Sequence, residues 1–454
     1  MKKALLLSCF GLFVWSQGYS QKLNTWQSAQ KNQVREVSKT AVRESFPKDF
    51  TLFKLDISSL KDKLFSINDD ASKSVIVSIP NSNGGLEEFQ VYESSNFTKE
   101  LQAEFPEIRA YKGVGIDDKY AQVRLSIDEK GIQAMVFRTD KKNEFIEPYS
   151  ADGTIYAVFN SSREKGNLPF VCSTEEQVLA NNLLHRTTNE IESTSTELLT
   201  FRLAISCNAE YANFFGATNA SQSGLVLAGF NATMTRVNGV FERDFAIHMN
   251  LISETTNVIY YNPATDPYTT MGQWNSQLQN TLTNVIGEAN YDIGHLFGGS
   301  GGGGNAGCIG CVCQSGKGSG YTSPSDGVPV GDLFDIDYVA HEMGHQFGAN
   351  HTFSHSVEGS GVNVEPGSGS TIMGYAGITS RDVQPNSDDY FVYASIKQIQ
   401  DNMASKTCPI RTPLTNLPPV VNAGLDYTIP KGTPFVLTGV ASDPNGDLLS
   451  YCWE

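Results

Sequence analysis

The stretch from His341 to His351 constrains the fold of this chain more than any other part of its sequence. It reads His341-Glu-Met-Gly-His-Gln-Phe-Gly-Ala-Asn-His351. On a helix, side chains four residues apart share one face, so the imidazoles of His341 and His345 can bind one metal ion. Gly348 lets the backbone leave the helix with a positive φ and return His351 as a third ligand. Three protein ligands leave one coordination position open, which is typical of a catalytic zinc site.

The helix that carries these histidines is predicted to run from Asp332, which can cap it, to Gly348. Its core-facing stripe is apolar and comprises Ile336, Val339, Ala340, Met343 and Phe347. Glu342 lies one position round the helix from His341, and its carboxylate can reach a water molecule on the metal. The motif therefore predicts one catalytic zinc ion with Glu342 as general base. The alternative is three structurally satisfied histidines.

The histidine spacing, followed by a methionine turn at Thr371-Ile-Met-Gly-Tyr375, resembles the metzincin metallopeptidases. The resemblance implies that Met373 forms an apolar floor under the zinc. Three further stretches look like those of bacterial reprolysin-like enzymes, namely 238–244, 291–295 and 383–387. The resemblance implies an α/β catalytic domain, a twisted mixed sheet with long helices, that hydrolyses internal peptide bonds of polypeptide substrates.

Two positions depart from the reprolysin pattern. Reprolysins usually have aspartate directly after the third histidine, where this chain has Thr352. Tyr375 follows the turn methionine by two residues, as in astacins and serralysins. By similarity, Tyr375 is an extra ligand that swings away to hydrogen-bond the oxyanion; the alternative is an ordinary packed tyrosine.

The first twenty residues have the features of an export signal. Lys2 and Lys3 precede an apolar run, and small residues suit cleavage before Gln21. A lipoprotein modification at Cys9 is the weaker alternative, because little apolar sequence precedes that thiol. No later stretch is long and apolar enough to span a bilayer. We expect a secreted, extracellular protein without membrane insertion.

Residues 21–190 are predicted to form a β-rich region without catalytic motifs. Alternating or β-branched segments predict strands at 74–79, 89–92, 121–127, 132–138 and 154–159. The region resembles the propeptides of reprolysin-like enzymes, which implies that the protein is made as a zymogen. A polar stretch, 185–196, suits an exposed linker in which Arg186 offers a tryptic-like cut.

The catalytic domain is predicted over residues 191–412. Its expected elements are a helix at 221–242 and strands at 199–206, 245–252 and 257–261. As a hypothesis, substrate pairs with an edge strand at 306–313. The pocket for the side chain after the cut is expected partly behind 376–378, and the glycine-rich stretch 298–304 is treated as a loop.

Residues 413–454 are predicted to be a linker and the start of a C-terminal, Ig/PKD-like β-sandwich. Short strands are expected at 427–429, 435–438 and 448–453. The stretch 443–447 is either a tight turn or a calcium loop. The sequence ends inside an apparent strand, so we expect a longer protein, with cell-surface attachment through its remainder as an open alternative.

Seven cysteines remain after the signal is removed, so at least one lacks a partner within the chain. Cys172 lies near the end of the propeptide-like region. By similarity to reprolysin propeptides, its thiolate occupies the open zinc position and silences the enzyme; a disulfide half or an inert thiol are the alternatives. His248, His295 and His355 are interpreted as structural or surface residues.

The formal net charge is −16. This charge has the wrong sign for a nucleic-acid or anionic-membrane binder, so we expect neither partner. Two other functions compete with a zinc endopeptidase. An exopeptidase with two histidines and a distant glutamate is disfavoured by His351, and a binding protein that has lost activity is disfavoured by the intact Glu342.

Overall fold

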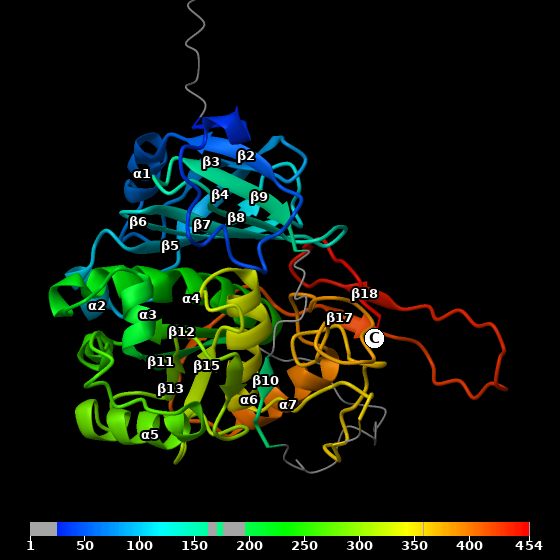
Figure 1. Cartoon of the computed structure of the whole chain (residues 1–454). Helices are drawn as coiled ribbons and strands as arrows, with labels where there is room; N and C mark the ends of the chain where they lie inside the picture. The colour runs from blue at the N-terminus through cyan, green and yellow to red at the C-terminus, as the bar shows by residue number, and fades with distance from the viewer. Residues whose placement is uncertain (1–24, 162–169, 176–195, 357, 454) are drawn as a thin grey trace, which may run out of the picture.

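The computed structural model describes residues 25–161, 170–175, 196–356 and 358–453 (Figure 1). The predicted export signal and Arg186 lie outside these residues. Among the helices of the described ranges, none combines the length and hydrophobicity needed to cross a bilayer.

The N-terminal region forms one nine-stranded sheet whose strands follow the order β1-β2-β9-β8-β7-β6-β5-β4-β3. All of its strand pairs are antiparallel. The strands are β1 (Trp26–Ala29), β2 (Thr51–Leu55), β3 (Val75–Pro80), β4 (Leu86–Glu93), β5 (Arg109–Gly115), β6 (Gln122–Asp128), β7 (Gly131–Phe137), β8 (Glu144–Pro148) and β9 (Ile155–Asn160). The five strands predicted from alternation in this region are confirmed. Three short helices complete the region: η1 (Lys31–Gln33), α1 (Ile57–Phe65) and α2 (Lys99–Glu104).

Both faces of this sheet are covered, which explains why strands such as β7 and β9 carry apolar residues on both sides. Val123, Val136 and Val158 belong to a core enclosed by the N-terminal region itself. Met135 and Phe159 belong instead to the core shared with residues 196–413, the predicted catalytic region. The sheet therefore presents one hydrophobic face to the rest of the molecule, and it sits on helix α4 (Ser223–Phe245) (Figure 1).

The catalytic region is built on a mixed sheet with the strand order β10-β14-β15-β13-β11-β12, and β16 pairs with β11. Its strands are β10 (Val171–Cys172), β11 (Glu197–Cys207), β12 (Ile247–Leu251), β13 (Ile293–Phe297), β14 (Gly303–Asn305), β15 (Gly320–Ser323) and β16 (Ile410–Pro413). Strands β12, β11, β13 and β15 are parallel, whereas β14 runs antiparallel to β15. The α/β architecture with a mixed sheet is confirmed.

Helices cover both faces of the catalytic sheet. The remaining helices before the metal-binding motif are α3 (Ala209–Phe214), η2 (Ala220–Gln222), η3 (Ser253–Val258), η4 (Met271–Gln273) and α5 (Trp274–Val285). The long helix α4 belongs to the main core, and α5 packs on a smaller core that includes Trp274 and Leu296. The predicted strand at 257–261 is wrong: the chain there ends η3, and its pairing with β11 is one isolated bridge between Cys207 and Ile259.

The helix that carries the histidine motif begins differently from the prediction. Residues Leu333–Ala340 form a π-helical segment, η5, and α6 (His341–Phe347) continues from it. Asp332 precedes η5 but makes no side-chain cap; its carboxylate faces Arg43 of the N-terminal region instead. The predicted end is right, because Gly348 has φ +129°. Helix α7 (Tyr393–Ala404) packs against α6.

The C-terminal residues do not form the predicted sandwich within the described chain. Two short antiparallel strands, β17 (Val420–Asn422) and β18 (Val440–Ser442), are paired, and most side chains from 413 to 453 are exposed. The three predicted strands at 427–429, 435–438 and 448–453 are absent there. The expectation of an Ig/PKD-like domain is therefore not confirmed, because residues 413–453 enclose no core of their own.

Two disulfides lie in the catalytic region, Cys308–Cys311 and Cys313–Cys408. The second joins the loop after β14 to the chain that follows α7. Cys172 and Cys207 carry free thiols. The prediction from cysteine parity, that at least one thiol stays outside the disulfides, is confirmed.

Candidate zinc site

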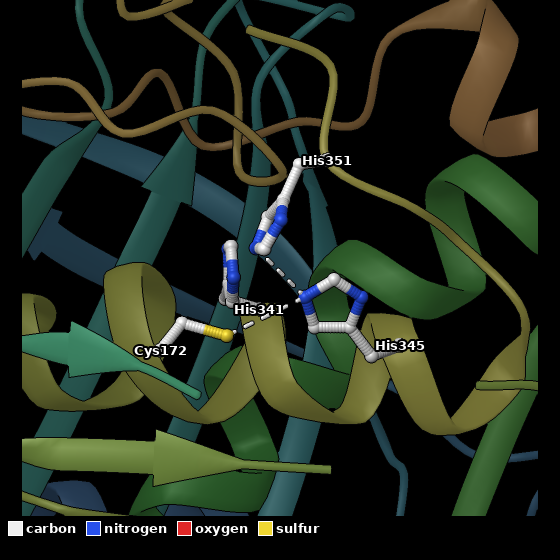
Figure 2. A group of neighbouring side chains, drawn as sticks. All are labelled: Cys172, His341, His345 and His351. Atoms are coloured by element: carbon white, nitrogen blue, oxygen red, sulfur yellow. Dashed lines mark hydrogen bonds between the residues drawn. The ribbon is translucent and has the colours of Figure 1, made fainter. Parts of the chain in front are cut away.

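The structure brings together four side chains that the sequence marked: Cys172, His341, His345 and His351. Their candidate ligand atoms all lie within 4.8 Å of one another. Figure 2 shows the three rings and the sulfur converging on one point, with two rings from α6, one from the turn after it, and the sulfur from β10. The rings are almost fully shielded from solvent, whereas Cys172 is half-buried.

The second nitrogen of each ring is fixed by a hydrogen bond on the side away from this point. The Nδ1 of His341 lies 2.6 Å from the carbonyl oxygen of Ile372, and that of His345 lies 2.7 Å from the carbonyl oxygen of Ala349. The Nδ1 of His351 lies 2.9 Å from the Glu358 carboxylate. Each ring thus donates from Nδ1 and directs the lone pair of Nε2 inward, which is the tautomer that a metal requires.

The inward nitrogens fit a zinc ion. His345 Nε2 lies 3.1 Å from His351 Nε2 and 3.7 Å from the sulfur of Cys172. Zinc–nitrogen bonds of roughly 2.0–2.1 Å in tetrahedral geometry place neighbouring ligand atoms about 3.3 Å apart, which is close to these separations. The Nε2 of His341 is buried and has no hydrogen-bond partner among the described residues. Burying a ring nitrogen without a partner costs free energy. A metal ion bound to this nitrogen is the simplest explanation of its burial.

Electrostatic effects at this point favour a thiolate. Burial opposes ionisation of the Cys172 thiol, but the interactions of its thiolate with the neighbouring rings of His341, His345 and His351 outweigh burial and hold the pKa of Cys172 well below its usual range. Burial, followed by repulsion from the other rings, lowers the pKa of His345 to about 4. Neutral imidazoles and an anionic sulfur are the protonation states in which these groups bind zinc.

Glu342 is fully buried beside the histidines. Burial, and then the neighbouring Cys172 thiolate, raise the pKa of Glu342 well above its usual range. One carboxylate oxygen, Oε2, accepts a hydrogen bond of 3.0 Å from the hydroxyl of Thr174, and Oε1 has no partner among the described residues. A Cβ at Gly304 would lie 2.1 Å from Oε1, so the glycine-rich stretch leaves the space that this carboxylate occupies.

Met373 and Tyr375 lie on the turn that faces the histidines. Met373 is buried, and its sulfur would lie 2.8 Å from a Cβ at Gly344, so the thioether packs directly on α6. The ring centroid of Tyr375 is 4.6 Å from that of His351. Burial, and then the negative charges of Cys172 and Glu342, raise the pKa of Tyr375. Tyr375 therefore stays protonated and can donate a hydrogen bond at the site.

The segment Phe170–Glu175 lies beside the histidines, where its strand β10 extends the sheet at one edge. β10 pairs in parallel with β14, and the Ser173 amide donates to the Gly304 carbonyl at 2.9 Å. Phe170 stacks on Tyr338 of η5 with ring centroids 3.7 Å apart. The edge strand that accepts an extended segment is therefore β14, and the hypothesis of a strand at 306–313 is wrong because that stretch consists of turns closed by Cys308–Cys311.

The structure also identifies neighbours of the site that the sequence did not predict. Thr174 and Glu358 contact Glu342 and His351, yet neither belongs to a motif. The histidines interpreted as structural have other surroundings. Both ring nitrogens of His295 face protein partners, Gln346 and Thr322, and His248 lies against Glu242. His355 is exposed.

Comparison with known proteins gives one result. Residues 198–403 match the family model described as metallo-peptidase family M12B, reprolysin-like. The match contains α6, the turn with Met373 and all three histidines of the site. No curated protein matches the chain significantly.

Proposed function

Residues 198–403 belong to the reprolysin-like M12B zinc metallopeptidases, and from this premise we propose that the chain is the latent precursor of a secreted zinc endopeptidase. Such a peptidase acts on polypeptides. His341, His345 and His351 are the proposed zinc ligands, and Glu342 is the proposed general base. One observation carries the assignment: three Nε2 atoms face one point beside a buried carboxylate whose Oε1 has no partner among the described residues.

The reaction requires a polarised carbonyl, an activated water and a proton carrier. A bound zinc ion supplies Lewis acidity, which polarises the scissile carbonyl and lowers the pKa of water. Glu342 accepts the proton of the attacking water and delivers it to the leaving amine. The raised pKa of Glu342 suits this transfer, because a carboxylate with the ordinary value holds a proton too weakly to deliver it efficiently near neutral pH.

The remaining side chains orient the reactants. The Tyr375 hydroxyl, held protonated, is proposed to donate to the developing oxyanion. Met373 gives α6 an apolar support. The edge of β14 is proposed to bind an extended substrate through backbone hydrogen bonds, since it already pairs with β10 in this way.

Latency is assigned to the segment Phe170–Glu175. The proposed inhibitory group is the sulfur of Cys172. It lies at the fourth position around the point on which the three Nε2 atoms converge, here called the metal point. The Thr174 hydroxyl adds a second block, because it donates to Glu342 and accepts the Ala306 amide at 2.8 Å. One short segment thus engages both the metal site and the base, so removing it is the proposed activation step.

Export, domain limits and the C-terminal region remain proposals based on the sequence. Residues 1–20 are proposed as the signal peptide, 21–190 as the propeptide and 191–412 as the catalytic domain. Residues 413–454 are proposed as a linker and the beginning of a β-sandwich. The stretch 443–447 is proposed to be either a tight turn or a calcium-binding loop.

The test uses the mature protein, freed of its N-terminal region. It should contain one zinc ion, digest an unfolded protein such as casein, stop with a chelator and recover with added zinc. Glu342→Gln should retain zinc and lose about 10²–10⁴-fold in kcat/KM, the usual contribution of a general base. Glu288→Gln, a partly exposed carboxylate of the same region, should leave activity unchanged. Zinc binding without cleavage, and no effect of Glu342→Gln, would favour a binding protein instead.

A further inference from the structure

Glu365 lies between the third histidine and the methionine turn, in a part of the sequence without a motif. We infer that Glu365 is a positioning residue. It links the backbone next to His351 to the turn that orients the His341 ring. The inference rests on the proposed function only in requiring a metal at the three histidines. The residue is buried, with 6% of its surface exposed.

The first connection leads to the third histidine. The hydroxyl of Thr352, the residue directly after His351, donates a short hydrogen bond to Oε2 of Glu365. The backbone repeats the link, because the Glu365 amide donates to the Thr352 carbonyl at 2.9 Å. Two hydrogen bonds thus fix the chain that carries the His351 ring.

The second connection leads to the first histidine. Oε1 of Glu365 accepts the amides of Ser370 at 2.9 Å and Thr371 at 3.0 Å, and Oε2 accepts the Thr371 hydroxyl at 2.7 Å. These contacts fix the start of the methionine turn. The carbonyl of Ile372, the next residue of the turn, accepts the hydrogen bond from Nδ1 of His341. The carboxylate thereby sets the position of the acceptor that orients the His341 ring.

The donors around Glu365 are all neutral. Three hydroxyls, including that of Ser370 at 3.5 Å, and two backbone amides hold the carboxylate, and no ion pair with it occurs in the described part of the chain. A buried carboxylate with such donors is held by directed hydrogen bonds, which are sensitive to geometry. Removing the carboxylate leaves two amides of the methionine turn without an acceptor, and the turn must shift to reach another one. The His341 and His351 rings should then lose their mutual alignment, which lowers zinc affinity.

The test measures zinc affinity of the full chain by competition with a chelator, without using peptidase activity. Glu365→Ala should weaken zinc binding about 10–100-fold, the usual effect of losing a group that orients metal ligands. The visible spectrum of the cobalt-loaded protein should shift, because the ligand geometry changes. Glu365→Gln should keep most of the affinity, since its carbonyl oxygen can accept both amides while its NH₂ donates to the two threonine hydroxyls.

Asp292→Asn provides the matched control. Asp292 is an equally buried carboxylate that pairs with Arg202 away from the metal point, so its loss should destabilise folding and leave zinc affinity unchanged. If Glu365→Ala fails to fold, Thr352→Val and Thr371→Val each remove one hydroxyl donor and should still weaken zinc binding. Wild-type zinc affinity in Glu365→Ala, or in both threonine variants, would overturn the inference. Failure of the unaltered chain to bind zinc would instead overturn the proposed function.

Discussion

Two parts of the N-terminal half meet the catalytic region in different ways. The segment Phe170–Glu175 reaches the metal point and the base through Cys172 and Thr174. The nine-stranded sheet instead lies on α4 (Figure 1). An apolar face and buried charges hold it there. A few residues are thus enough to block the chemistry, whereas holding the two regions together takes a whole sheet. Blocking and holding should therefore be separable by mutation.

The buried charges form a continuous network between the regions. Glu147 of β8 pairs with Arg43 at 2.8 Å and with Arg236 of α4 at 3.1 Å. Arg236 also pairs with Asp335 of η5 at 2.7 Å, and Arg43 lies 3.5 Å from Asp332. Since η5 continues into α6, the network connects the N-terminal sheet to the helix that carries the metal site.

The largest expected effect comes from breaking this network at its centre. Glu147→Ala leaves two buried arginines without their shared partner, so the precursor should lose about 3–5 kcal/mol of unfolding free energy. Hydrogen exchange should rise in α4 and η5. Glu144→Ala is the matched control: it removes one buried partner of Arg138 within the N-terminal sheet, and exchange should rise there and not in α4. Equal protection of α4 in both variants would show that the network does not hold the regions together.

The second effect is the pH dependence of the unfolding free energy, which should differ between the two regions because only one of them contains histidine. The sheet has no histidine, whereas His295 is buried in the catalytic region, where burial lowers its pKa to about 4. Between pH 6.5 and 4 the unfolded chain binds a proton at His295 that the folded chain does not, so stability falls as pH falls. The loss should reach about 3 kcal/mol. Denaturant unfolding should show a smaller difference in unfolding free energy between pH 7 and pH 5 for His295→Gln than for the unaltered chain. An unchanged difference would show that His295 does not cause the pH dependence.

The third effect concerns Cys172, the residue of the segment Phe170–Glu175 that lies at the metal point. Cys172→Ala removes the sulfur and leaves the sheet in place, so the uncleaved chain should gain roughly 100-fold in peptidase activity, equivalent to about 2.7 kcal/mol. The unfolding free energy should change little. Cys207→Ala, at a buried thiol away from the metal point, serves as the control and should leave the uncleaved chain latent. Continued latency of Cys172→Ala would assign the block to another group.

The smallest effect concerns the base. Thr174→Val keeps the size of the side chain and removes the hydroxyl that engages Glu342. One hydrogen bond to a charged acceptor contributes about 1.5 kcal/mol, so the uncleaved chain should gain about tenfold in activity. Ser173→Ala is suited as the neighbour control, because its hydroxyl contacts the Gly304 carbonyl rather than Glu342. Equal gains in both variants would argue against a specific block of the base.

The sequence predicted those features that local periodicity determines. Five of the nine strands of the N-terminal sheet, α4 and the end of α6 at Gly348 follow from alternation, helical spacing and a glycine with positive φ. The histidines and Met373 could be found because one motif and one turn carry them. Asp332 was misassigned as a cap because Arg43, nearly three hundred positions away, attracts its carboxylate. Thr174, Glu358 and Glu365 could not be predicted, since only tertiary folding brings them to the site.

The most direct test of the zinc assignment is X-ray absorption at the zinc edge on the purified precursor. We expect one zinc ion with three nitrogen ligands at roughly 2.0–2.1 Å and one sulfur ligand at about 2.3 Å. The sulfur should disappear from the spectrum of Cys172→Ala and be replaced by a lighter atom. A site without sulfur in the precursor, or a precursor that binds no zinc, would contradict the account.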